Sequence, residues 1–150
     1  VLKSGQWNNA DSLVGARTIL IANGKVNLGF SKAFVLGILC NWLVCLAVWM
    51  SFGSDSQVGK MLSAFFPVTI FVLSGFEHSI ANMYYVPAGI LAKSIPEYVA
   101  ATGLDQAALS SLNWGEFFTH NLIPVTLGNI VGGGLFVAIA YWLAFRNKGN

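Results

Sequence analysis

The stretch LSGFEHSIANMYYVP, residues 73–87, decides the fold because it places two ionisable side chains inside a long apolar segment. Apart from Glu77, residues 61–92 contain no Asp, Glu, Lys or Arg. As one straight helix this segment would measure about 48 Å, whereas a hydrocarbon core is about 30 Å thick. Each half alone is shorter than a usual span of about 20 residues. The stretch therefore predicts one span broken into two half-helices, with Ser74 and Gly75 at the break.

The composition indicates a membrane protein. Of the 150 residues, 55% are hydrophobic and 9% are charged, whereas a soluble domain carries about 25% charged residues. The net charge is +2, and the scattered basic residues form no stripe, so nucleic acid is not a predicted partner. Cys40 and Cys45 match no common metal motif, and we interpret them as small packing residues. No metal or cofactor is predicted.

The rest of the chain completes an all-α membrane fold with three spanning segments. Its predicted parts are an extramembrane segment (1–25), a span (26–52), the broken span (61–92), a polar connection (93–120), a last span (121–145) and a tail (146–150). Within the first part, Asp11 to Ile21 is a candidate amphipathic helix that Asn23 and Gly24 would end. In the connection, Asp105 and Asn113 are candidate helix caps.

Small residues mark one face of the last span. Gly128 and Gly132 form a small-xxx-small pair, which Gly133 and Gly134 extend. Such a face lets two membrane helices approach closely. We interpret it as a helix-packing surface.

The predicted break favours binding of a small anion. A second half-helix exposes backbone N–H groups at its start, and its dipole attracts negative charge there. His78 stands at that start, and Ser79 is a candidate cap. Because an imidazole titrates near physiological pH, His78 can hold or donate a proton to the anion of a weak acid. Glu77 would repel such an anion, so we expect it to point away.

Several polar and apolar residues extend this candidate site. An unpaired Glu77 carboxylate would be costly to bury, so we expect it to find donors, and the candidates are Asn82, Lys25 or backbone N–H groups of the break. Asn82 lies four residues after His78, so the two share a face if the helix begins near His78. The alternative is a purely structural role, in which Glu77 and His78 only provide hydrogen bonds to the backbone groups at the break.

The first span carries a further polar residue near its centre. Asn41 should face protein or a pore, because an amide is costly in lipid. Val44, one turn later, and Phe71, just before the break, are candidates for an apolar constriction that excludes hydrated ions. On sequence alone, each is more simply interpreted as a core residue.

Three segments resemble the second half of the formate/nitrite transporter family. They are ANGKVNLGFSKAFVLGILCNWLVCLAVWM (22–50), GFEHSIANMYYVPAGI (75–90) and NLIPVTLGNIVGGGLFVAIAYW (121–142). The match around GFEHSIANM is specific. The sequences of the last two segments resemble the formate branch of the family more than the nitrite branch. The resemblance implies an aquaporin-like protomer of six spans, built from two inverted repeats, of which this chain is the second. It also implies a homopentamer in the bacterial inner membrane.

The family resemblance assigns roles to the candidate residues. The position of His78 matches the central pore histidine, and Asn41 matches a pore-facing asparagine. Glu77, Asn82 and Lys25 match a polar network around the histidine. The resemblance likewise gives constriction roles to Val44 and Phe71. It implies a periplasmic connection and a cytoplasmic tail, and a cargo of formate, nitrite or hydrosulfide, carried with or without protons.

The chain departs from the family pattern in one respect. The family pore also uses a broken second span with a loop threonine, and nothing in these residues matches it. We therefore expect a partner half, in a chain about twice as long or as a cleaved piece. The leading function is a formate channel or formate/proton symporter and not an enzyme. The alternatives are a nitrite or hydrosulfide channel, a structural anchor, or a redox subunit with His78 and His120 as haem ligands.

Overall fold

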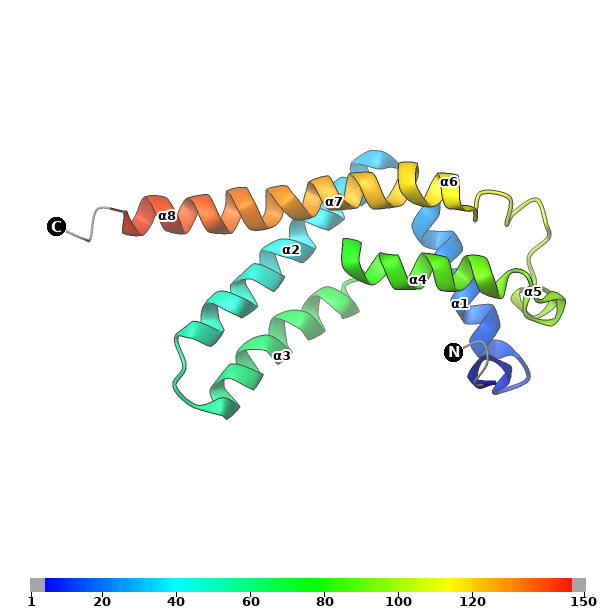
Figure 1. Ribbon diagram of the computed structural model, residues 1–150, viewed down its shortest axis with the longest axis horizontal. Coiled ribbons are helices and arrows are strands. Elements are labelled where there is room, and N and C mark those ends of the chain that lie inside the picture. Colours follow the sequence, from blue (N-terminus) through cyan, green and yellow to red (C-terminus); the bar gives the residue numbers. More distant parts are fainter. Residues whose placement is uncertain (1–4, 147–150) are drawn as a thin grey trace. The chain divides into compact units, whose positions relative to one another are not determined.

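The computed structural model describes residues 5–146, so the predicted tail lies outside the described residues beyond Arg146. The described part consists of helices joined by turns and irregular segments, with no β-strand. Two compact units are present, one formed by residues 1–30 and 80–123 and the other by residues 31–79 and 124–150. Figure 1 shows the helices along the chain. Each unit is described by itself.

The first unit contains the N-terminal helices and the helices around the polar connection. They are η2 (Gln6–Asn8), α1 (Leu13–Val26), α4 (Ser79–Ala92, from Ile80 onward), α5 (Pro96–Thr102), α6 (Trp114–Glu116) and the π-helical η3 (Phe117–Leu122). Helix α1 packs against α5, where the ring of Tyr98 covers Gly15. Lys93 fastens the connection to the end of α4, because its ammonium donates to the carbonyls of Leu109 and Leu112 at 2.6 and 3.2 Å.

Helix α1 differs from the predicted helix at its C-terminal end. It continues through Asn23 and Gly24 and ends at Val26. Ile19, Ala22 and Val26 recur at helical spacing and are fully buried, so the apolar face of α1 outweighs the local Asn-Gly stop signal. An exposed helical glycine costs only about 1 kcal/mol, which this burial offsets.

The second unit contains the long apolar helices. They are α2 (Phe30–Phe52, from Ser31 onward), α3 (Gln57–Leu73), α7 (Ile123–Ile130, from Pro124 onward), the π-helical η4 (Val131–Ile139) and α8 (Ala140–Phe145). The stretch 114–145, which includes α6 and η3, is one continuous helix. This stretch and α2 are each long and apolar enough to cross a membrane, by length and composition. Helix bounds do not fix where a bilayer would lie, so the predicted span limits remain predictions.

The predicted glycine face packs directly against α2. A Cβ atom on Gly128 or Gly132 would overlap a carbonyl oxygen of α2, that of Phe34 or Ile38. On Gly133 it would lie 2.6 Å from Asn41 Nδ2 and 2.8 Å from the Sγ atom of Cys45. The packing prediction is confirmed for these three glycines, whereas a Cβ on Gly134 would meet nothing within 4 Å.

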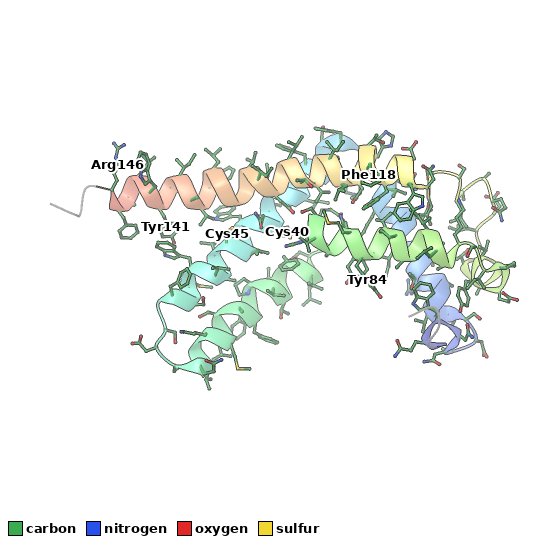
Figure 2. All side chains as sticks on the ribbon, viewed as in Figure 1. Cys40, Cys45, Tyr84, Phe118, Tyr141 and Arg146 are labelled. Atoms are coloured by element: carbon green, nitrogen blue, oxygen red, sulfur yellow. The ribbon has the colours of Figure 1, made fainter. Side chains whose placement is uncertain are left out.

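The cysteines of α2 take part in the same packing. Cys40 and Cys45 are free thiols, the first buried and the second half-buried (Figure 2). Trp42 stacks on Phe136 in the same unit, with ring centroids 5.5 Å apart. These contacts hold α2 side by side with the part of the long helix 114–145 that belongs to this unit, hereafter the C-terminal helix, and this pairing positions the candidate site.

Candidate functional site

Helix α3 ends in a local turn that its own sequence closes. Gly75 adopts φ +67°, and its N–H donates to the carbonyl of Val72 at 3.1 Å. The N–H of Phe76 donates to the carbonyl of Phe71 at 3.0 Å. This pair of bonds is a Schellman motif, which satisfies carbonyls at a helix end and favours glycine at the left-handed position. Ser74 is the C-terminal cap of α3.

The residues that follow are held by other helices of the same unit. The N–H of Glu77 donates to the carbonyl of Leu36 in α2 at 3.3 Å. Asn129 of α7 is 7% exposed, and its Nδ2 donates to the carbonyls of Glu77 at 3.0 Å and Gly37 at 2.9 Å. The N–H of Ser79 donates to Asn129 Oδ1 at 2.9 Å. The cap of α4 at this donor therefore comes from Asn129 and not from the Ser79 side chain.

Sequence reasoning missed Asn129, although a signal for it was present. Asn129 is a polar residue inside the apolar last span, just as Asn41 is in the first span, and an amide in such a position needs protein or a pore beside it. In the structure Asn41 Nδ2 donates to the backbone carbonyl of Asn129 at 2.7 Å. Asn41 thus contacts protein, one of its two predicted surroundings. Val44 is half-buried one turn later in α2.

His78 and Phe71 come together at the break. Their rings are stacked with centroids 5.9 Å apart and an angle of 27° between the planes. His78 is half-buried, and it lies between two residues whose backbones bond to Asn129. This places an imidazole beside a large apolar ring at the start of a helix. A group in that setting can offer a hydrogen bond or a proton to a small anion that has shed water.

Glu77 is buried, with 4% of its surface exposed. Both backbone groups of Glu77 are hydrogen-bonded: its N–H donates to Leu36, and its carbonyl accepts from Asn129. The predicted pairing of its carboxylate with Asn82 or Lys25 stays a prediction.

A second amide network lies in the first unit. Asn82 Nδ2 donates to Asn121 Oδ1 at 2.8 Å, and both asparagines are fully buried. Asn121 Nδ2 in turn donates to the backbone carbonyl of Lys25 at 2.9 Å. The Lys25 ammonium lies 5.7 Å from the ring centre of Tyr85. The structure thus links Lys25 and Asn82 through Asn121, a residue that sequence reasoning also missed.

The predicted site residues therefore fall into two groups. Asn41, Phe71, Glu77 and His78 belong to the second unit, as do Val44, Ser74 and Gly75. Lys25 and Asn82 belong to the first unit. That all of them line one passage stays a prediction.

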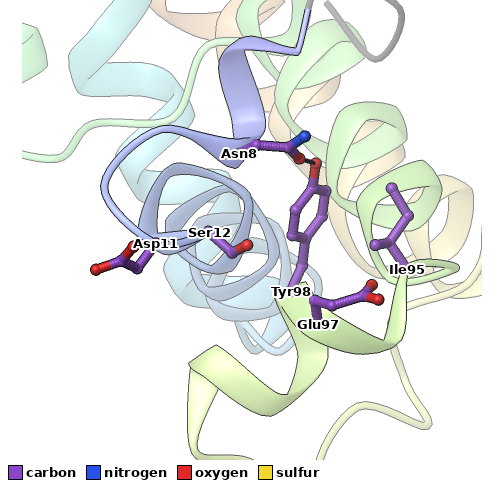
Figure 3. Close-up of a pocket in the computed structure, with 6 residues that line it drawn as sticks. All are labelled: Asn8, Asp11, Ser12, Ile95, Glu97 and Tyr98. Atoms are coloured by element: carbon purple, nitrogen blue, oxygen red, sulfur yellow. Dashed lines mark hydrogen bonds between the residues drawn. The ribbon is translucent and has the colours of Figure 1, made fainter.

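Two other features of the first unit share no residue with this site. His120 is exposed, and its Nδ1 lies 2.5 Å from Glu116 Oε2 one helical turn away. A cavity of about 640 Å³ is lined by Asn8, Asp11, Ser12, Ile95, Glu97 and Tyr98 (Figure 3). The Tyr98 hydroxyl closes it on one side by donating to Asn8. Among residues 5–146, no cluster of His, Cys, Asp and Glu could hold a metal ion.

Comparisons with known proteins place these residues in a wider context. A family model described as formate/nitrite transporter matches residues 1–143. The formate channel FocA of Escherichia coli K12 is 45% identical over 149 residues, covering 98% of this chain and 52% of FocA. A probable formate transporter of Methanothermobacter thermautotrophicus is 42% identical, covering 99% of this chain and 50% of that protein.

A solved structure shares the fold of the chain. It is a pentameric formate channel with formate bound, and it aligns with a TM-score of 0.87 and 44% identity. The alignment covers 97% of this chain and 58% of that chain. The chain spans about half the length of the curated relatives it matches.

Proposed function

Because the chain belongs to the formate/nitrite transporter family, we propose that it forms part of a membrane channel for formate. Membership confirms the family predicted from the sequence, and it confirms that the chain belongs to a transporter and not to an enzyme. The observation that carries the choice of formate is the likeness to the formate-bound pentamer over 97% of the chain. The same likeness supports a homopentamer in the lipid bilayer. We also propose that the protein lies in the bacterial inner membrane as a multi-pass protein.

His78 is the proposed centre of the pore. Formate reaches it past the apolar side chains of Phe71 and Val44, which are costly for a hydrated ion to pass. The imidazole then donates a hydrogen bond or a proton to the carboxylate. A neutral acid crosses apolar rings far more cheaply than an anion, so protonation lowers the barrier to passage. The stacking of Phe71 on His78 supports this arrangement.

The remaining polar residues have supporting roles in this proposal. Asn41 lies beside the passage, and Glu77 points away from the anion. Glu77, Asn82 and Lys25 form a network that keeps the carboxylate from repelling the substrate. The hydrogen bonds from Asn82 to Asn121 and onward to the Lys25 carbonyl support a fixed geometry for one side of that network. The complementary half of each pore comes from residues that lie outside this chain.

Formate flux into vesicles tests the proposal. The intact protein is reconstituted as wild type, as His78→Ala and as His120→Ala, a control that removes an exposed histidine. We expect His78→Ala to reduce formate uptake by at least tenfold, and His120→Ala to leave it close to wild type. Size-exclusion chromatography verifies that each variant assembles. Equal uptake by wild type and His78→Ala at both acidic and neutral pH would remove His78 from the mechanism.

Nitrite and hydrosulfide are the alternative cargoes, and the description of the matching family names nitrite beside formate. Competition uptake assays with the three anions rank them. We expect formate to compete most strongly. If formate ranks last, the transport class stands but the proposed substrate does not.

A further inference from the structure

We propose that Asn129 determines the anion selectivity of this pore by occupying a backbone donor at the start of α4, so that recognition depends on His78. The inference deepens the proposed function and rests on it. It begins with a helix start placed next to a histidine. The first N–H groups of an α-helix have no partner within the helix, and together with the dipole they attract any small anion.

The structure closes one of these donors with protein. The Ser79 N–H, the first of α4, donates to Asn129 Oδ1 at 2.9 Å. The Asn129 amide cannot rotate away without cost, because its Nδ2 donates to the carbonyls of Gly37 and Glu77. Asn41 also holds the Asn129 backbone carbonyl. The side chain is buried, so water does not replace these bonds readily.

This closure has a chemical consequence for selectivity. A free N–H would bind chloride as readily as formate, because a backbone donor does not distinguish a strong-acid anion from a weak-acid anion. His78 does distinguish them, because only the anion of a weak acid accepts its proton. By occupying the Ser79 N–H, Asn129 leaves the imidazole as the discriminating group. Asn129 is thus a specificity-determining residue that touches the protein backbone and need not touch the substrate.

The decisive variants separate the exposed donor from general loosening of the structure. Asn129→Ala frees the Ser79 N–H. The double variant Asn129→Ala/Ser79→Pro loses the same amide but has no N–H at position 79, and proline is well tolerated at the first position of a helix. Ser63→Ala is the control, since it also removes a side-chain hydrogen bond from the second unit, but that bond runs to the carbonyl of Gly59 within α3.

Chloride and formate fluxes are measured on the intact protein in vesicles. We expect Asn129→Ala to raise the chloride-to-formate flux ratio at least tenfold, and both the double variant and Ser63→Ala to stay within about twofold of the wild-type chloride flux. An unchanged ratio in Asn129→Ala overturns the inference. So does an equal chloride gain in the double variant, because position 79 then has no N–H to expose.

Two further measurements make the inference independent of the formate proposal. Hydrogen–deuterium exchange at the Ser79 amide should accelerate at least tenfold in Asn129→Ala and stay unchanged in Ser63→Ala. If wild type carries no formate, the proposed function fails while the chloride and exchange results still decide the role of Asn129. If Asn129→Ala does not assemble, Asn129→Leu frees the same N–H while keeping a branched side chain in the buried position. Chloride flux must then rise, and an unchanged chloride flux in Asn129→Leu overturns the inference.

Discussion

The end of α3 and the start of α4 both interrupt a helix within apolar sequence, yet their hydrogen bonds come from different places. The end of α3 is closed by neighbours in sequence, through Gly75 and the Schellman pair. The start of α4 is closed by residues of other helices, with Asn129 bonded to Ser79 across 50 sequence positions and to Gly37 across 92. One side of the break is therefore set by local conformation and the other by helix packing.

This difference predicts where mutations act. A mutation on the α3 side of the break, at the end of α3, should weaken only the local turn, because the hydrogen bonds there join residues close in sequence. A change on the α4 side should depend on how closely α2 approaches the C-terminal helix. Only a close approach brings Asn129 within reach of both α2 and the break.

The largest effect is expected from Gly132→Ala, which disturbs the helix packing that supports the start of α4 but leaves the Asn129 side chain in place. The added Cβ would overlap the carbonyl oxygen of Ile38, so α2 and the C-terminal helix must move apart. Overpacking of this kind costs about 1–3 kcal/mol. Unfolding in detergent should show that loss of stability, and the Ser79 amide should exchange faster as Asn129 is drawn away.

Gly134→Ala is the matched control for this prediction. It lies two positions further along the same helix, and its added Cβ meets nothing within 4 Å. We expect its stability to equal or slightly exceed that of wild type, since alanine favours a helix over glycine. Equal destabilisation by the two variants would contradict the packing origin of the α4 side.

A smaller effect is expected from Gly75→Ala on the α3 side. The added Cβ meets no atom within 4 Å, so the only cost is the left-handed backbone, about 1 kcal/mol for alanine. Exchange should rise at the Phe76 amide and stay unchanged at Ser79. Gly24→Ala, at a helical glycine of α1 with open space around it, should instead stabilise the protein. A loss of protection at Ser79 in Gly75→Ala would show that the two sides are coupled.

The same contrast explains how much of the site could be predicted from the sequence. The break at Gly75 was predictable because span length and glycine chemistry are both local properties. The glycine face was predictable because its spacing is helical. Asn129 and Asn121 were not identified, since a polar residue in an apolar helix indicates only that it needs a hydrogen-bond partner. Which partner it finds depends on the packing of segments far apart in the chain.

The positions of helix ends follow the same logic. Asn113 was predicted as a cap, and its Oδ1 accepts from the N–H of Glu116 at 3.0 Å at the start of α6. Asp105 makes the equivalent local bond, accepting from the N–H of Ala108 at 2.7 Å, but only a turn follows. The helix after Asn113 continues into the long apolar stretch, whereas the segment after Asp105 is held by Lys93 through its carbonyls. A cap signal therefore marks a favourable start without deciding whether a helix extends.

The smallest effect is expected from Asn41→Leu, which tests whether the support of Asn129 extends beyond its side chain. Asn41 donates one hydrogen bond to the backbone carbonyl of Asn129. Hydrogen bonds between membrane helices contribute about 0.6 kcal/mol on average, so detergent unfolding should show a loss of about that size. Ser63→Ala is the control, because the Ser63 hydroxyl bonds only within its own helix, to the carbonyl of Gly59. The Ser79 amide should keep most of its protection in Asn41→Leu, because the Asn129 side chain retains all three of its bonds. If protection at Ser79 is lost as completely as in Asn129→Ala, the α4 side depends on the whole α2 contact and not on the Asn129 amide alone.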